Sequence, residues 1–288
     1  MLKLEVYIEE DGDFVLAGQI QGETWEDARF IYEKSYLENQ SHQPVSISLP
    51  FQEDAFSPFE TRCYFEGLLP EGYTRRCVAG WMHVAEEDYL SVLAGLGNEC
   101  LGAVRICEPG AGGCSPSYKK ISREELLEFA KEGASKSAQF LAKAHLSLTG
   151  ASGKTGLYYD NKDGWYMPFG TAPSTHIVKQ SHVRLSGIVA NEQLCLRTAK
   201  ILGIDVPESF IISVGTGEHI LFATKRFDRL MQEDSRVIDG KKVPFRLQQE
   251  DFAQALGVPA SQKYEKIGDS YLKLSLIHIS EPTRHSLI

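Results

Sequence analysis

The spacing of apolar residues changes along the chain, from a period of two near the start to a period of three or four further on. Residues 2–8 and 14–20 alternate as β-strands do, and the acidic, glycine-containing segment 9–13 between them predicts a turn. Short β-type runs follow at 30–32 and 45–50, the second with clean alternation. Helical spacing then predicts three helices, at residues 74–84, 87–96 and 123–131.

A second unit of structure is expected from about residue 139. Before it, the strand-like run 103–106 ends at a glycine-rich turn, and residues 108–120 are rich in Gly, Pro and Ser, which predicts a linker. The second unit opens with a glycine-containing loop at 147–156. Its further predicted elements are strands at 157–159, 164–166 and 175–180, a helix at 190–202 and a hairpin of 210–214 with 219–224. Together these elements predict an α+β fold.

The composition supports a folded protein of about two domains. The chain has 288 residues, a mass of 32.1 kDa and 42% hydrophobic residues, enough for a sizeable core and for domains of ~150 residues. This excludes wholesale disorder and coiled coil. No apolar run approaches the ~20 residues of a membrane-spanning helix, and the start lacks the layout of a signal peptide. We therefore expect a soluble, cytoplasmic protein without membrane contact.

Charge is unevenly distributed. Residues 1–60 contain 3 Lys and Arg against 13 Asp and Glu, which makes direct binding of nucleic acid by this part unfavourable. Residues 141–230 contain ten basic and seven acidic residues. That local excess suits an anionic ligand, although solvated surface lysines explain it equally well.

The six cysteines predict no metal site. None forms a Cys-x-x-Cys pair or a Cys/His cluster at zinc spacing, and reduced thiols are expected in the absence of a secretory signal. Cys107 and Cys114 flank a glycine-rich turn, but two thiolates without further ligands do not make a zinc site.

The loop 148–155 carries the first candidate chemistry. Its ending, Gly153-Lys154-Thr155, is similar to a Walker phosphate loop, but Leu148 stands where that motif requires glycine. Two other interpretations remain open: a glycine-rich surface turn, and a flap whose N–H groups and Lys154 hold nucleotide phosphates as in kinases. A P-loop ATPase is disfavoured by Leu148.

Lys179 favours the kinase-like interpretation. It ends a predicted strand, on the same face as Ile177, and a lysine on an inner face is costly to desolvate unless it meets an anion. Glu192, near the start of the next helix, is available to pair with it, as in phosphoryl-transfer enzymes. The segment 224–229 then leaves a strand where a kinase-like lobe presents main-chain groups to adenine. Solvated positions for Lys179 and for this turn are the alternatives.

The residues as a set resemble the HipA family of serine/threonine kinases over roughly residues 2–271. The motifs that carry the resemblance are residues 65–72, 96–103, 146–155, Trp165, Pro168, Gly170, Pro173, 174–179, 190–192, 202–204, 206–207, 225–229, 249–257 and 263–265.

The resemblance implies a type II toxin–antitoxin kinase that uses ATP and Mg²⁺. It implies a phosphate lysine at Lys179, an ion-pair partner at Glu192, and autophosphorylation at Ser147, which ejects the loop. It further implies a phosphate loop of Thr149, Gly150, Ala151, Ser152, Gly153 and Lys154 and a hinge of Lys225, Arg226 and Phe227. Family partners are a helix-turn-helix antitoxin, through which alone DNA is contacted, and a protein substrate such as an aminoacyl-tRNA synthetase.

The expected organisation follows from the same resemblance. Residues 1–107 form a β-rich amino-terminal subdomain, 108–138 a linker and helix, and 139–271 a kinase-like lobe with an antiparallel sheet and one packed helix. Residues 272–288 are expected to be a non-native tail, because they resemble translated adaptor sequence.

The catalytic residues of the family are not found. Phosphoryl transfer needs an Asp with an Asn five residues later and a second Asp for Mg²⁺, and no Asp after Asp228 has such an Asn. We expect that native sequence stops near Tyr271, that most of the helical lobe is missing, that kinase activity is negligible and that exposed apolar surface lowers solubility. The alternative function is a non-catalytic antitoxin-binding module.

Overall fold

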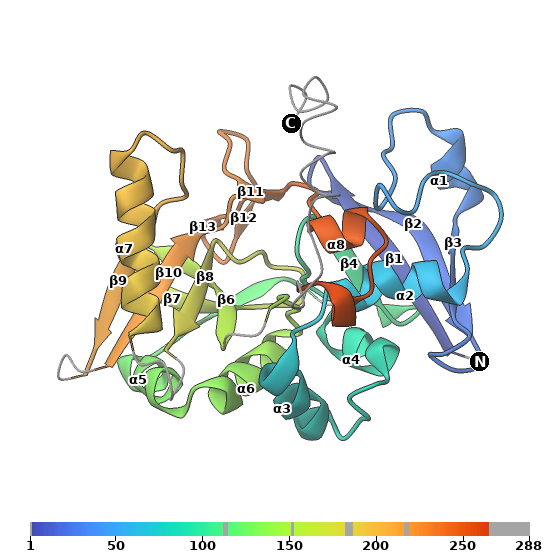
Figure 1. The fold of residues 1–288 in the computed structure, drawn as a ribbon. Coiled ribbons are helices and arrows are strands. Elements are labelled where there is room, and N and C mark those ends of the chain that lie inside the picture. Colours follow the sequence, from blue (N-terminus) through green and yellow to red (C-terminus); the bar gives the residue numbers. More distant parts are fainter. Residues whose placement is uncertain (1, 112–114, 151–152, 182–186, 216–218, 265–288) are drawn as a thin grey trace.

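The computed structural model describes residues 2–111, 115–150, 153–181, 187–215 and 219–264. They form one four-stranded and one six-stranded antiparallel sheet, which lie at opposite sides of the molecule in Figure 1. Helices α3 to α6 run beneath the sheets in that view. The predicted α+β class is confirmed.

The amino-terminal hairpin is the centre of the first sheet. The predicted turn is present, with positive φ at Asp11 and Gly12. In the order β3-β2-β1-β4, the strands are β1 (Leu2–Glu10), β2 (Asp13–Gly22), β3 (Arg29–Tyr32) and β4 (Val104–Cys107). Between β3 and β4 lie the helices α1 (Lys34–Glu38), α2 (Pro58–Gly67), α3 (Gly72–Met82) and α4 (Tyr89–Leu96).

Helix α2 shows why apolar spacing alone missed an element. Its buried positions include a polar residue, Thr61, a glycine, Gly67, and the consecutive run 63–65, so apolar residues alone do not outline a helical face. Its start is set by local chemistry instead. Ser57 and Glu60 form a reciprocal capping box, with Pro58 in the first turn.

The strand predicted at 45–50 is wrong. These residues form a tight turn in which the N–H of Leu49 donates to the carbonyl of Ser46 at 3.1 Å. Their alternation comes from the turn itself, since Leu49 is buried and Ile47 is 76% exposed. The carboxylate of Glu250 accepts from both the hydroxyl of Ser46 and the N–H of Ile47, which stabilises the turn.

The second sheet contains the predicted strands and one more. In the order β5-β7-β6-β8-β10-β9, the strands are β5 (Ser117–Lys120), β6 (Lys154–Asp160), β7 (Gly164–Phe169), β8 (His176–Gln180), β9 (Ser209–Val214) and β10 (His219–Lys225). β5 lies inside the predicted linker 108–120, so this part of the linker prediction is wrong. Its pairing with β7 is a contact between distant segments, which local composition does not reveal.

Helices contact both faces of this sheet. α5 (Arg123–Glu132) and α6 (Ala134–Ala144) cover the face that carries Leu157, Val178 and Leu221. α7 (Ile188–Ile201) packs against β9 and β10 on the other face. Gly203, with φ of 80°, follows it as the predicted left-handed residue.

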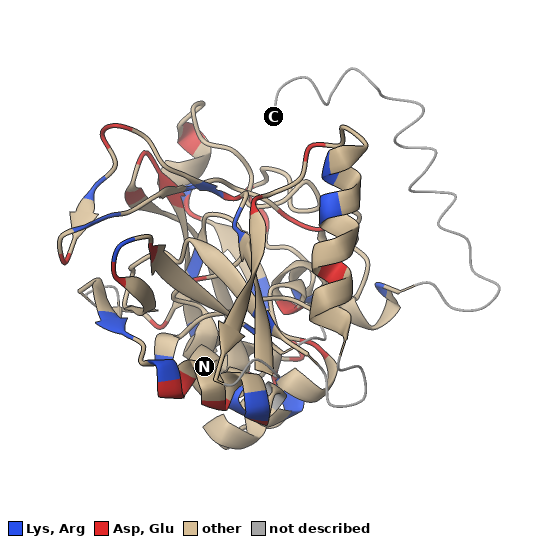
Figure 2. Ribbon diagram, turned by 90° about the vertical axis from the view of Figure 1, so that its left-hand side faces the viewer, with Lys and Arg blue, Asp and Glu red and all other residues tan. Residues whose placement is uncertain are grey.

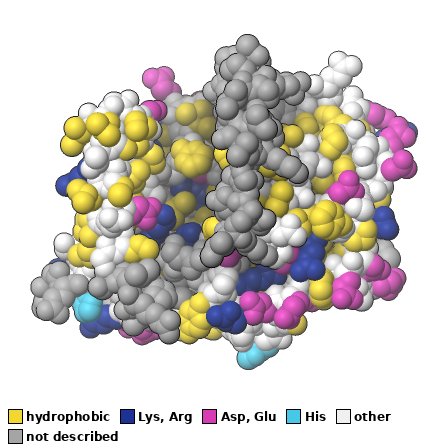
Figure 3. Space-filling model, in the orientation of Figure 1, with side chains coloured by type: hydrophobic (Ala, Val, Ile, Leu, Met, Phe, Trp, Pro, Cys, Tyr) yellow, Lys and Arg dark blue, Asp and Glu magenta, His cyan; other side chains and the backbone are white. Residues whose placement is uncertain are grey.

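The outer side of α7 and the loop after it are apolar and exposed. Leu194, Ile201, Leu202 and Ile204 are each more than half exposed, and Figure 3 shows hydrophobic side chains gathered over this helix. A contiguous apolar surface of this kind is typical of a contact region.

The segment after β10 returns to the first unit. Its elements are β11 (Arg229–Leu230), β12 (Val237–Ile238), β13 (Lys241–Lys242), β14 (Phe245–Arg246), α8 (Phe252–Ala255) and the 3₁₀ helix η2 (Ala260–Gln262). Arg246 forms a buried ion pair with Glu9, and the Gln254 amide donates to the carbonyl of Tyr64 at 3.0 Å. The predicted tail 272–288 lies outside the described residues. Within the described part, no helix combines the length and apolar character needed to cross a bilayer.

A buried ionic cluster joins the two units. Arg226 forms two hydrogen bonds to the carboxylate of Asp228, at 2.6 and 2.8 Å. Arg229 donates to Glu99 at 3.1 Å, and Nη1 of Arg226 lies 3.5 Å from the same Glu99 oxygen. All four side chains are at most 3% exposed. Two acids and two guanidinium groups balance in charge, which makes their burial tolerable.

The cluster keeps its carboxylates ionised. Burial raises the pKa of Glu99, but the charges of Arg226 and Arg229 outweigh burial and hold that pKa below its usual value. The same two guanidinium groups hold the pKa of Asp228 well below its usual range against burial. Both acids therefore stabilise the fold as anions.

We expect the substitution Glu99→Gln to lower the free energy of unfolding by about 3 kcal/mol, because it leaves two buried guanidinium groups with one carboxylate. Urea denaturation measures the change. Since the pKa of Glu99 is lowered in the folded chain, its stabilisation is present above the usual pKa of 4.5 and is lost as the pH falls through the folded value. The matched control is Glu53→Gln, at an exposed position. Equal urea midpoints for both variants would contradict the role of the cluster.

Candidate functional site

Two lysines lie side by side on one face of the six-stranded sheet. Lys154 in β6 is the direct cross-strand partner of Lys179 in β8, and Lys179 is the partner of Phe222 in β10. Direct partners share a face, so these side chains form a row across three adjacent strands. The burial pattern of β8 places Ile177 on this face too, as the alternation predicts.

Lys179 is paired with Glu192 of α7. Its Nζ donates to Oε1 of Glu192 at 2.5 Å and lies 5.7 Å from the ring centroid of Phe222. Glu192 is the single acidic residue of α7, and Figure 2 shows the acidic and basic positions along the ribbon. The helix therefore brings one carboxylate to the lysine of the sheet, which is the pair that the sequence predicts.

Lys154 is largely buried, and no described residue forms a hydrogen bond or ion pair with its Nζ. The pKa of Lys154 is lowered to about 8, chiefly by burial and also by the charge of Lys179, against the opposing charges of Glu71 and Glu192. A buried ammonium beside a second ammonium is costly. The two lysines together therefore favour an anion above this face of the sheet.

The loop before β6 is docked on the first unit. The N–H of Glu71 donates to the carbonyl of Gly150 at 3.3 Å, and Thr149 Oγ1 donates to Oε1 of Glu71 at 3.1 Å. Gly150 has a φ of 100°, and a Cβ there would lie 2.6 Å from Nζ of Lys154. A side chain at position 150 would therefore be strained and would displace the lysine.

Two loop residues of the prediction, Ala151 and Ser152, lie outside the described residues. Gly153 is at the end of the loop, where its carbonyl accepts from the N–H of Gln180 at 3.2 Å. This bond ties the loop to β8 one residue after Lys179. The described part of the loop thus lies next to both lysines.

Ser147 is fully buried between the two units. Its hydroxyl donates to the carbonyl of Leu68 at 2.7 Å, and its N–H donates to the carbonyl of Glu99 at 2.8 Å. A phosphoryl group at this position would replace the donated proton and place negative charge against a carbonyl oxygen. Phosphorylation of Ser147 is therefore incompatible with the docked loop.

The predicted hinge residues point in different directions. Lys225 ends β10 and is exposed, and Phe227 is 73% exposed. The Arg226 side chain is fully buried in the ionic cluster, so it is not available to a nucleotide. The N–H of Arg226 also has a partner, the carbonyl of Thr175 at 2.9 Å. Of the three residues, only Lys225 and Phe227 present side chains to solvent.

The sequence prediction did not include Glu71 as a site residue, nor Lys263. Glu71 follows Pro70 in a turn before α3, and Lys263 was noted only as part of the motif 263–265. An acid in a turn gives no local signal of contact with a loop 78 residues away. The Pro70–Gly150 bridge could have been found only from the tertiary structure.

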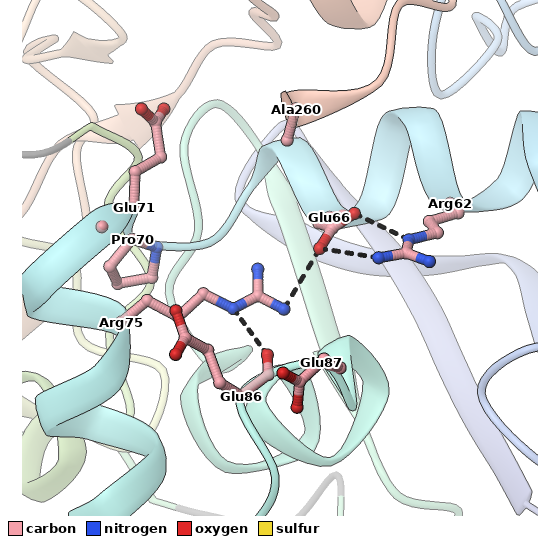
Figure 4. Close-up of a pocket in the computed structure, with 9 residues that line it drawn as sticks. Arg62, Glu66, Pro70, Glu71, Arg75, Glu86, Glu87 and Ala260 are labelled. Carbon is pink, nitrogen blue, oxygen red and sulfur yellow. Dashed lines mark hydrogen bonds and ion pairs between the residues drawn. The ribbon is translucent and has the colours of Figure 1, made fainter. Parts of the chain in front are cut away.

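A pocket of about 360 Å³ is lined by Glu71 among other residues. Figure 4 shows the carboxylate of Glu66 between the guanidinium groups of Arg62 and Arg75. Nε of Arg62 lies 2.8 Å and Nη2 of Arg75 3.2 Å from the carboxylate of Glu66, and Nε of Arg75 donates to the carbonyl of Glu86. Neither Lys154 nor Lys179 lines this pocket.

Comparison with known proteins identifies related families. The family model of the HipA N-terminal domain matches residues 4–107, and that of the HipA-like C-terminal domain matches residues 146–285. The chain is 30% identical to "Putative kinase Y4mE" of Sinorhizobium fredii, over 90% of this chain and 61% of that protein. It is 27% identical to the serine/threonine-protein kinase toxin HipA of Shewanella oneidensis, over 92% of this chain and 58% of the toxin.

A solved structure shares the fold. It is the complex of Shewanella oneidensis MR-1 HipA with HipB and operator DNA, which matches with a TM-score of 0.70 and 25% identity. The match covers 93% of this chain and 59% of that one. The chain thus spans about three fifths of the length of the relatives that it matches.

We expect Ser147→Ala to lower the free energy of unfolding by about 1 kcal/mol, because it removes one buried hydrogen bond. We expect Ser147→Asp to cost about 3 kcal/mol, because an uncompensated charge is then buried against the Leu68 carbonyl. Urea denaturation gives both values, and amide hydrogen exchange at residues 146–150 shows whether the loop is released in the Asp variant. Equal stability and equal exchange of the two variants would mean that residue 147 is not buried in solution.

Proposed function

The chain belongs to the HipA family, and from this premise we propose that it forms the nucleotide-binding part of an ATP-dependent serine/threonine protein kinase. The observation that carries the proposal is the row of Lys154 and Lys179 on one sheet face, with Glu192 paired to Lys179 and no anionic partner for Lys154 among the described residues. A lysine and a helix glutamate in this relation are what kinases use to hold nucleotide phosphates.

Each residue of the proposed site has a distinct task. Lys179, oriented by Glu192, binds the α- and β-phosphates. Lys154 and the N–H groups of the loop 149–153 bind the remaining phosphate oxygens. Lys225 and Phe227 lie at the end of β10, where the base is expected, and contribute main-chain groups and an exposed ring.

ATP fits the described residues, and no metal site is assigned among them. The largely buried ammonium of Lys154, which has no ionic partner among the described residues, lies against Gly150, where the lack of a Cβ leaves room for it. ATP, when bound, supplies the phosphoryl group. Among the described residues, however, no three Asp, Glu, His or Cys side chains gather as a metal site does. We therefore derive no step through a metal ion.

Phosphoryl transfer by this 288-residue chain is proposed to be negligible. No Asp after Asp228 is followed five residues later by an Asn, so the sequence lacks the acid and amide that orient the acceptor and the metal. Binding of ATP and its turnover are thus separate properties here.

A second function is proposed from the solved complex. That structure contains HipA with HipB and operator DNA, and the first unit of this chain is matched by the HipA N-terminal family model. We propose a helix-turn-helix antitoxin as a partner, with DNA contacted only through it, and an aminoacyl-tRNA synthetase as the class of substrate. Co-purification with such an antitoxin in the absence of ATP would support the binding function on its own.

We expect the chain to bind ATP, and Lys179→Ala and Lys154→Ala each to raise the dissociation constant by about 10- to 100-fold, because each removes a charged hydrogen bond worth ~1.5–3 kcal/mol. Isothermal titration calorimetry measures the change. The matched control is Lys200→Ala, at an exposed position on α7. Loss of binding in the Lys154 variant with unchanged binding in the Lys179 variant would contradict the kinase-like site and favour a P-loop ATPase.

The affinity for ATP is expected to depend on pH above neutrality. The pKa of Lys154 is about 8 without ligand, and a bound anion raises it, so binding takes up a proton at higher pH. The dissociation constant should therefore be constant below pH 7.5 and rise above pH 8, by at most about tenfold per pH unit. The variant Lys154→Met should bind ATP weakly, and its affinity should not depend on pH in this range. The variant Lys179→Met should keep the pH dependence, but at higher pH, because the charge of Lys179 no longer lowers the pKa of Lys154. A flat profile for the unmodified chain would show that Lys154 does not meet the phosphates.

A further inference from the structure

Three distant segments meet at the carboxylate of Glu71. Oε1 accepts from Nζ of Lys263 at 2.8 Å and from Thr149 Oγ1 at 3.1 Å, and Oε2 accepts from the hydroxyl of Tyr264 at 2.7 Å. Glu71 belongs to the first unit, Thr149 to the phosphate loop, and Lys263 and Tyr264 to the segment after η2. One side chain thus connects the loop to two other parts of the fold.

Lys263 completes the junction. Its Nζ donates to Thr149 Oγ1 at 3.1 Å and forms an ion pair with Asp251 at 2.8 Å, in addition to its bond with Glu71. The Thr149 hydroxyl therefore donates to an acid and accepts from a lysine, which fixes its orientation. Both partners are mostly buried, with side-chain exposures of 16% for Glu71 and 19% for Lys263.

The same segment also fixes the main chain of the loop. The N–H of Glu71 donates a hydrogen bond to the carbonyl of Gly150, which holds this oxygen against the first unit. The Cβ direction of the same glycine faces Lys154. Carbonyl oxygens repel phosphate, whereas N–H groups attract it. Holding this carbonyl therefore favours a loop conformation suited to phosphate.

The charges show how an acid is tolerated next to a phosphate site. Burial raises the pKa of Glu71, but Lys263 and Tyr264 outweigh burial and keep the acid ionised. Burial lowers the pKa of Lys263, and Asp251 and Glu71 more than compensate. The negative charge of Glu71 is thus bound by Lys263 rather than exposed to an incoming anion.

We propose that Glu71 is a positioning residue of the nucleotide site, which holds Thr149 and Gly150 of the phosphate loop in place with the help of Lys263. This inference rests on the proposed function, because it assumes that the loop meets nucleotide phosphates. By this proposal the first unit contributes Glu71 to the nucleotide site. Lys263 and Tyr264 of the 263–265 motif hold the carboxylate of Glu71 in place.

The test compares ATP with adenosine in Glu71→Ala and Glu71→Gln. We expect Glu71→Ala to raise the dissociation constant of ATP about tenfold or more and to leave that of adenosine within twofold, since adenosine has no phosphates. Glu71→Gln keeps acceptors for Thr149 and Tyr264 but loses the charge that binds Lys263, so its effect should be smaller. Glu87→Ala, at an exposed position of the neighbouring loop, is the control. Amide hydrogen exchange should rise at residues 146–150 and stay constant in the β1–β2 hairpin.

Several outcomes separate the possibilities. An unchanged dissociation constant for ATP with unchanged exchange at 146–150 overturns the inference. Equal losses for ATP and adenosine also overturn it, because they show a general structural role. If Glu71→Ala does not fold, Glu71→Gln decides by the same criteria. If the unmodified chain binds no ATP, the proposed function is wrong. In that case, faster amide hydrogen exchange at residues 146–150 in the Glu71 variants would still support the inference that Glu71 positions the loop.

Discussion

The buried pairing of Glu99 with Arg226 and Arg229 is the constraint on which the rest of the structure depends. The Glu99 side chain lies in the first unit and accepts from guanidinium groups that follow the last long strand of the second sheet. Its main chain bonds to His145 and Ser147. One residue therefore fixes the end of β10 and the start of the loop before β6 at once. Burial of four charges costs little only where the acids and guanidinium groups lie in good ion-pairing geometry. The two units therefore have one favoured arrangement.

The two lysines of the sheet differ in a way that defines their tasks. Lys179 is neutralised by Glu192, and its charge is accommodated whether or not a ligand is present. Lys154 has no such partner among the described residues, and its pKa is lowered to about 8. A site that must bind and release an anion benefits from one fixed and one adjustable cation. In the proposed nucleotide site, the fixed pair would set the position of the ligand, and Lys154 would gain most when the ligand binds.

Local patterns predicted the parts of the site that lie close in sequence. Lys179 and Glu192 are 13 residues apart in consecutive elements, so strand alternation and the start of the next helix were enough to bring them together. Arg226 lies in a charged run that looks solvated, and its burial depends on Glu99, 127 residues away. The contact of Glu71 with Thr149 likewise follows from the packing of two units. Strand β5 was missed for the same reason, because pairing with β7 decides its structure.

The docked loop is held at both ends, and this explains how a change at one residue could release it. Glu99 bonds to the main chain at residues 145 and 147, and Glu71 bonds to residues 149 and 150. Ser147 lies between these anchors, with its hydroxyl against the carbonyl of Leu68. Net hydrogen bonds contribute about 1 kcal/mol each, so the anchors together amount to a few kcal/mol. A phosphate of charge about −1.5 to −2 at this buried position would cost a comparable or larger amount. The energy that docks the loop is thus of the size that one phosphorylation can overcome, which makes the buried serine suited to act as a release point.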